Sequence, residues 1–126
     1  MNKLRFFKCN KCEEVIVKLI DKDAKLSCCG EEMKEILANT VDASLEKHMP
    51  VVNVNNGFVE VKVGSVLHPM EEAHYINFIA VETENGYSVV TLTPNQSPEA
   101  KIYVGKNKVI AVYEYCSLHG LWKVEI

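Results

Sequence analysis

The sequence predicts a mainly β protein, in which a small metal-binding module precedes an immunoglobulin-like antiparallel β-sandwich. Two observations predict this class. Four of the five cysteines stand in two pairs near the N-terminus. Beyond residue 50, short runs rich in valine, isoleucine and tyrosine alternate with turn signals, at the spacing expected of a sandwich. Only residues 41–47 have a helical period of any length.

The composition limits the class of protein but does not identify an activity. Hydrophobic residues make up 48% and charged residues 25% of the chain, which is ordinary for a globular protein. A formal net charge of -3, without a lysine- or arginine-rich run, gives no sign of nucleic-acid binding. No apolar stretch reaches the ~18 residues of a membrane span, and none near the N-terminus suits a signal peptide. We therefore expect a cytoplasmic protein with no nucleic-acid or membrane partner.

The N-terminal cysteines predict one metal site. Cys9 and Cys12 form a CxxC, and fifteen residues separate Cys12 from the adjacent Cys28 and Cys29. The residues between them suggest a strand at 14–20 and a turn after it, so a hairpin would bring the two pairs together. Four thiolates suit zinc or a single iron, and metal binding supplies folding free energy to a small module. A vicinal disulfide is the alternative, but it is strained and disfavoured in a reducing cell.

The rest of the chain predicts the strands of the sandwich. In the run 58–63 the odd positions 59, 61 and 63 are valines and positions 60 and 62 are charged, so one face is expected to be buried and the other to face water. Asn55-Asn56-Gly57 is a hairpin signal that joins this strand to residues 51–54. Further strands are expected at 74–82, 87–92, 101–104, 109–116 and 121–126.

The remaining cysteine and the four histidines predict a second metal site. Cys116 stands three residues before His119, and the other histidines are His48, His68 and His74. Each lies at a loop or a strand end, where sandwiches carry their sites. Imidazole suits iron, zinc and copper, and a thiolate adds softness, so the residue types leave the metal open. Taken singly, each histidine could be a satisfied or exposed side chain, and a Cys/His nucleophilic dyad would lack a recognisable orienting residue.

Several segments resemble a known family. The CxxC followed by an adjacent cysteine pair resembles desulforedoxin and the N-terminal module of desulfoferrodoxin. The iron-binding segments of superoxide reductase are similar to residues 39–42, 46–48, 68–76 and 115–120. The chain thus resembles the two-centre desulfoferrodoxin form rather than the shorter neelaredoxin form. The resemblance implies a desulforedoxin-like module over residues 1–37 and a superoxide reductase domain over residues 38–126.

This resemblance implies two iron ions per chain. One would be held by Cys9, Cys12, Cys28 and Cys29. The other would have His48, His68, His74 and His119 in a plane, with Cys116 as axial thiolate and a sixth position open. The implied activity is the one-electron reduction of superoxide to hydrogen peroxide. An external donor such as rubredoxin would then re-reduce the iron.

The same resemblance assigns two further site residues. Lys47 is expected to draw superoxide in and to hydrogen-bond the reduced oxygen species, and Glu46 to occupy the open position once the iron is ferric. The family also implies a homodimer. The four-cysteine centre could relay electrons to the catalytic iron or be mainly structural. Two other functions stay open at this point: an electron carrier with a closed site, and a zinc-stabilised binding module.

Overall fold

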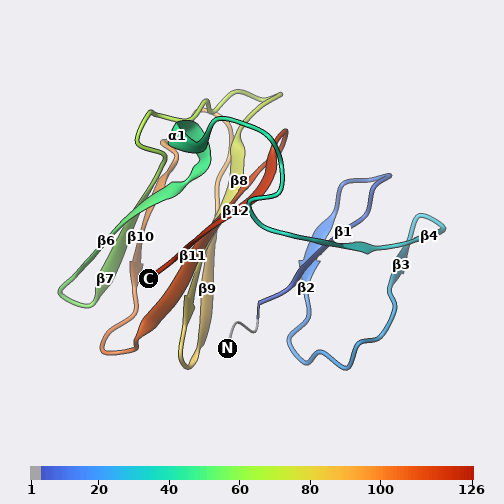
Figure 1. Cartoon of the computed structure of the whole chain (residues 1–126), viewed down its shortest axis with the longest axis horizontal. Helices are drawn as coiled ribbons and strands as arrows, with labels where there is room; N and C mark the ends of the chain where they lie inside the picture. The colour runs from blue at the N-terminus through green and yellow to red at the C-terminus, as the bar shows by residue number, and fades with distance from the viewer. Residues whose placement is uncertain (1–3) are drawn as a thin grey trace. The chain divides into compact units, whose positions relative to one another are not determined.

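The computed structural model describes residues 4–126 and divides into two compact units, Met1–Leu37 and Ala38–Ile126 (Figure 1). Nearly all of the regular structure in the described residues is β, as the sequence predicts. No helix within residues 4–126 is long and apolar enough to cross a membrane.

The N-terminal unit consists of five short strands. A three-stranded antiparallel sheet has the order β2-β1-β5, and a second ladder pairs β3 with β4. These strands are β1 (Phe6–Lys8), β2 (Val15–Val17), β3 (Ser27–Cys28), β4 (Glu31–Glu32) and β5 (Lys34–Ile36). The strand expected at 14–20 is therefore only three residues long. The core of the N-terminal unit is small, with Phe7, Cys9 and Met33 buried together.

The C-terminal unit is a sandwich of two antiparallel sheets. One sheet has the order β10-β7-β6 and the other the order β12-β11-β8-β9. The first is made of β6 (Pro50–Asn55), β7 (Phe58–Val63) and β10 (Glu99–Tyr103). The second is made of β8 (Ile76–Thr83), β9 (Gly86–Thr91), β11 (Val109–Cys116) and β12 (Gly120–Glu125). Each expected strand of the sandwich is present, with ends that move by up to two residues.

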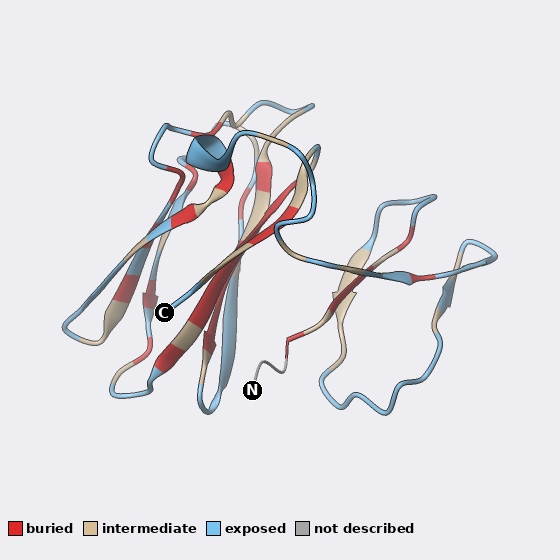
Figure 2. Ribbon diagram, in the orientation of Figure 1, coloured by how far each residue is buried: buried red, intermediate tan, exposed pale blue. Residues whose placement is uncertain are grey.

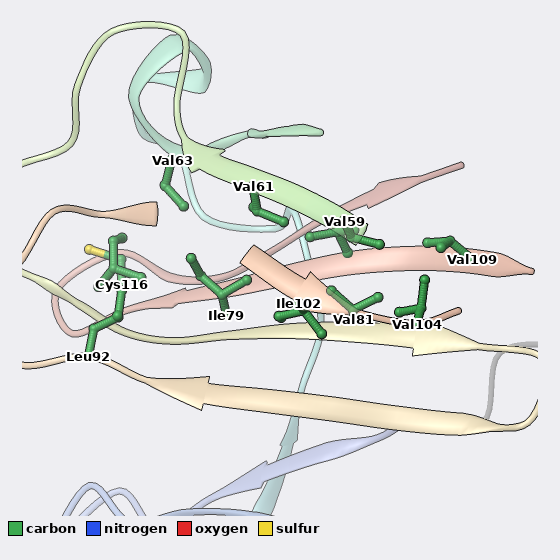
Figure 3. Packing of buried hydrophobic residues seen from close by; sticks show 12 residues of the cluster. Val59, Val61, Val63, Ile79, Val81, Leu92, Ile102, Val104, Val109 and Cys116 are labelled. Carbon is green, nitrogen blue, oxygen red and sulfur yellow. The ribbon is translucent and has the colours of Figure 1, made fainter. Parts of the chain in front are cut away.

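The alternation along β7 sets the inner face of its sheet. Val59, Val61 and Val63 are buried, whereas Glu60 and Lys62 between them are exposed. Figure 2 shows buried segments along the strands of the sandwich and exposed segments at its turns. The valines pack against the inner face of the other sheet, where Figure 3 shows Ile79 and Val81 on β8. Cys116 belongs to the same cluster and lies at one end of it, so the core reaches up to the thiol.

The only helix in the described part of the chain, α1, differs from the helical stretch expected at 41–47. It covers Leu45–His48, so His48 is its last residue and does not lie in a loop. Two features explain its shortness. Ser44 at its start makes no side-chain capping hydrogen bond. At its other end Pro50 disfavours helical backbone at Met49, which is extended.

Candidate metal centres

Several elements end together at one end of the sandwich (Figure 1) and carry the five predicted donors. His48 closes α1, His68 lies in the loop after β7, and His74 precedes β8. Cys116 ends β11, and His119 follows in the turn to β12. One ligand atom from each of His48, His68, His74 and Cys116 lies within 4.8 Å of those of the other three. His119 joins them, because its Nδ1 lies 3.1 Å from His48 Nε2.

The four imidazoles form a closed ring. Neighbouring ring centroids are 4.7 Å apart for His48 and His68, and 4.8 Å apart for His68 and His74. They are 5.0 Å apart for His74 and His119, and 4.9 Å apart for His119 and His48. Across the ring His48 and His74 are 6.4 Å apart. Four nearly equal sides and a longer diagonal describe a square of donors around one point.

The hydrogen bonds of two histidines determine which nitrogens face that point. His48 Nδ1 lies 2.7 Å from the Ser44 carbonyl oxygen, and His68 Nδ1 lies 2.7 Å from the Pro69 carbonyl oxygen. A carbonyl only accepts, so each Nδ1 carries the proton and each Nε2 keeps a lone pair. Burial lowers the pKa of both rings, that of His68 to about 4, so both are neutral near pH 7.

The inward nitrogens favour a cation at the centre of the ring. The Nε2 atoms of His48 and His68 are 3.1 Å apart, yet two lone pairs cannot form a hydrogen bond with each other. His74 Nε2 is buried, and no hydrogen-bond partner exists for it among the described residues. A metal ion among these nitrogens satisfies all of them. The donor set fits a first-row transition metal such as iron.

The fifth donor, Cys116, is fully buried on the sandwich side of the ring. Burial raises the pKa of its thiol, while the backbone N–H groups of Leu118 and His119 lower that pKa. The His119 N–H group donates to the sulfur at 3.4 Å. These two N–H groups favour the thiolate, and a bound cation would complete its deprotonation.

Two contacts that support the ring lie outside the set expected from the sequence. The Trp122 indole stacks on the His48 ring at 5.0 Å and donates from Nε1 to the His119 carbonyl at 3.2 Å. Ser117 and Tyr75 bond reciprocally, Tyr75 N to Ser117 Oγ at 3.1 Å and Ser117 N to Tyr75 O at 2.9 Å. The only signal of the first contact was an aromatic residue three positions after His119.

Glu46 and Lys47, the other predicted site residues, are exposed on α1 beside His48. Burial is the main reason that the pKa values of His48 and His74 are low, and the positive charge of Lys47 lowers them further. The Lys47 ammonium is therefore felt at two members of the ring. Two hydrogen bonds fix the Glu46 backbone: its carbonyl oxygen accepts from Val66 N at 3.0 Å and from Ser65 Oγ at 3.2 Å.

The four N-terminal cysteines also come together. Their sulfur atoms all lie within 4.8 Å of one another, and all four thiols are free. Cys12 Sγ lies 3.5 Å from Cys28 Sγ, and Cys28 Sγ lies 3.9 Å from Cys29 Sγ. Backbone N–H groups of Cys12 and Lys11 lower the pKa of Cys9 to about 6. In contrast, the crowding of its neighbouring thiols raises the pKa of Cys28.

The backbone after Cys28 explains how adjacent residues can both present sulfur to one point. Cys29 has φ of 53° and Gly30 has φ of 78°, so the chain turns through left-handed conformations. An all-sulfur set of four within this spacing fits zinc or a single iron.

Known proteins are similar to this chain in sequence and in structure. The desulfoferrodoxin family matches residues 40–125. A desulfoferrodoxin from Desulfarculus baarsii is 42% identical over 123 residues, covering 98% of this chain and 97% of the relative. One from Nitratidesulfovibrio vulgaris is 40% identical over 124 residues, covering 98% of each. The crystal structure of the superoxide reductase from Treponema pallidum is similar at a TM-score of 0.83 and 34% identity, covering 98% of this chain and 100% of that one. The chain belongs to the desulfoferrodoxin family.

Proposed function

We propose that this protein is a superoxide reductase, which converts superoxide to hydrogen peroxide without producing oxygen. The observation that carries the proposal is the square of inward-facing imidazoles with one buried sulfur beside it, in a chain of this family. Each superoxide takes up one electron and two protons to become hydrogen peroxide. Such chemistry protects a cell against oxidative stress.

We assign the ligands from the donors that converge. His48, His68, His74 and His119 would hold one iron with Cys116, and Cys9, Cys12, Cys28 and Cys29 would hold the second. Bound iron would supply the single electron of each reduction. The two units, Met1–Leu37 and Ala38–Ile126, would thus be a desulforedoxin-like module and a catalytic domain.

The charges around the site favour a small anion. The imidazoles are neutral donors, and Cys116 contributes a single negative charge, so a site built around a divalent ion stays positive. Lys47 adds a positive charge that already acts on His48 and His74. Lys47 would attract superoxide and hydrogen-bond the reduced oxygen species. Glu46, beside it on exposed α1, would close the site after turnover.

The replacement Lys47→Ala tests the attraction. We expect the rate constant for reaction with superoxide to fall about three- to tenfold at low salt, because one steering charge is lost. The wild-type rate should fall as salt rises, and the variant rate should depend less on salt. Lys62→Ala, which removes an exposed lysine from β7, is the matched control. If the rate constant for superoxide is unchanged in Lys47→Ala, Lys47 does not attract the substrate.

Pulse radiolysis of the reduced, iron-loaded protein tests the function itself. We expect oxidation by superoxide near the diffusion limit of ~10⁹ M⁻¹s⁻¹, with hydrogen peroxide as product. An electron carrier with a closed site would not be oxidised at such a rate. Metal analysis with a visible spectrum separates the third possibility, since a zinc-stabilised module would be colourless.

The partners follow from the chemistry. Each turnover leaves the iron oxidised, so an electron donor must re-reduce it, and we propose rubredoxin or a similar small carrier. A homodimer is also proposed, supported by Leu19 and Ile20 in the N-terminal unit, whose exposures of 86% and 79% leave two adjacent apolar side chains uncovered. The five free cysteines favour a reducing, cytoplasmic location.

A further inference from the structure

The turn after β7 packs directly under α1. A Cβ atom added to Gly64 would lie 2.5 Å from the Glu46 carbonyl oxygen, 2.8 Å from the Lys47 carbonyl carbon and 3.0 Å from the Lys47 oxygen. All three atoms belong to the main chain, so a side chain at this position could be accommodated only by moving the backbone of α1 or that of the turn. Glycine is therefore required at position 64, because there is no room for a Cβ atom between the turn and α1.

The same turn also holds α1 by hydrogen bonds. The Glu46 carbonyl accepts from Val66 N at 3.0 Å and from Ser65 Oγ at 3.2 Å. The turn itself folds back on β7, because His68 N donates to the Val63 carbonyl at 3.1 Å. Residues 64–66 thus connect the segment that carries Lys47 and His48 to the loop that carries His68.

The helix has little of its own to hold it in place. It is four residues long, its start makes no side-chain capping hydrogen bond, and Glu46 and Lys47 are exposed. A single turn of helix is unstable in isolation. Its position therefore depends on its contacts with the rest of the domain. Trp122 packs against the buried His48 ring at its end, and the Gly64–Val66 turn supports the Glu46 and Lys47 backbone.

We propose that Gly64 and Ser65 are positioning residues for the reaction: they set the height of the Glu46–Lys47 backbone and so present both side chains at the histidine ring. The inference rests on the proposed function. Gly64 provides the space for the close approach of the two segments, and Ser65 adds a hydrogen bond that keeps them together. Neither residue needs to touch superoxide.

Gly64→Ala and Ser65→Ala test the proposal, with Ser88→Ala, a change on the exposed strand β9, as the control. We expect Gly64→Ala to lower the superoxide rate constant about threefold or more, as Lys47→Ala does, and to flatten its salt dependence. Ser65→Ala should have a smaller effect in the same direction. The double variant Gly64→Ala/Lys47→Ala should react with superoxide no more slowly than Lys47→Ala. If Gly64→Ala acts by displacing the Lys47 side chain, it has no further effect once that side chain has been removed.

Hydrogen exchange of the iron-loaded proteins gives a readout that does not depend on activity. Peptides covering residues 45–49 and 64–68 should exchange about tenfold faster in Gly64→Ala than in the wild type, since the Val66 N–H group loses its acceptor. Peptides from β11 should be unchanged. If Gly64→Ala does not fold or load iron, Ser65→Ala, which removes one hydrogen bond only, supplies the same comparison.

Two results would overturn the inference. One is unchanged exchange and an unchanged superoxide rate in both variants. The other is a double variant whose rate falls by the product of the two single effects, which would mean independent damage. A wild-type protein that superoxide does not oxidise would instead disprove the proposed function, and the exchange experiment would still test the turn.

Discussion

Trp122 lies flat against His48 and holds the carbonyl of His119, so a single indole contacts two neighbouring members of the histidine ring. The chain has one tryptophan, and its exposed fraction is 1%. Its fluorescence therefore reports on this site without interference from any other indole.

We expect the fluorescence of metal-free protein to fall when the ring binds a transition metal that absorbs light, because the indole is stacked on a ligand. Titration with cobalt(II), followed by emission and by the visible spectrum together, measures it. His119→Ala, which removes one donor and leaves Trp122 in place, is a suitable control with weaker binding. Emission that stays constant although metal analysis finds two cobalt ions per chain, one for each site, would contradict the stacked arrangement.

Asp21 is the residue whose ionisation should affect the N-terminal unit. Its carboxylate accepts from Asp23 N at 2.9 Å, and Arg5 lies 2.7 Å away. The hydrogen bond from Asp23 is the largest cause that lowers the pKa of Asp21 below its usual 3.8, and Lys18 and Arg5 lower it further. A carboxylate with a lowered pKa stabilises the fold above the unfolded pKa and loses that effect as pH falls through the folded value.

We therefore expect Asp21→Asn to lower the melting temperature of the N-terminal unit at pH 7. The difference from wild type should shrink as the pH falls below 3.8. The absorbance of the four-cysteine iron centre on heating gives the melting temperature. Acid also weakens the thiolate ligands, but it does so in both proteins, so their difference isolates Asp21. A difference that grows in acid would reverse the assigned sign.

At this scale, residue types and spacing predicted which donors would meet. The groups that orient the donors were not predicted, because they depend on contacts formed only in the folded chain. The Ser44 and Pro69 carbonyls face the histidines through local backbone geometry, and Trp122 reaches His48 across the sandwich end. Main-chain partners and ring stacking carry no sequence signature of their own.

At the scale of elements, the alternation along β7 supports a direct test of packing. Val61 is 1% exposed in the middle of the strand, and Lys62 beside it faces solvent. Val61→Ala should lower the free energy of unfolding by about 1–3 kcal/mol, from lost burial and the cavity left behind. Urea unfolding followed by Trp122 fluorescence measures this change.

Lys62→Ala is the matched control for Val61→Ala, and it should change the free energy of unfolding by less than about 0.5 kcal/mol. Equal effects of the two changes would mean that β7 does not present its valines to the core.

The elements also show where sequence patterns lose accuracy. The run Val109–Cys116 was predicted with its observed ends because it is a long apolar run that ends at a turn. The expected helix at 41–47 became a single turn at Leu45–His48. Weak helical periodicity does not outweigh an uncapped start and a proline shortly after the end.

At the scale of the whole molecule, the two units have cores of very different size. Among the described residues, the buried cluster of the sandwich has twelve members, whereas the cluster of Phe7, Cys9 and Met33 in the N-terminal unit has three. A piece as small as the N-terminal unit usually needs a metal or a partner to fold.

We therefore expect metal removal under reducing conditions to unfold residues 4–37 while the sandwich keeps its sheets. Hydrogen exchange measured before and after chelation, and again after iron is restored, follows both units in one sample. Peptides from β7 and β11 serve as the internal control. If the N-terminal peptides stay protected from exchange without metal, the strands of the N-terminal unit are stable without a metal ion.

The anchored histidines have a consequence for the speed of electron transfer. His48 and His68 are tied to main-chain oxygens, so the fold aims their nitrogens whether or not an ion is bound. Surroundings that are already in place shift little when the charge at their centre changes by one. The energy needed to rearrange them should be low, and the centre should accept an electron rapidly from a donor of only slightly lower potential.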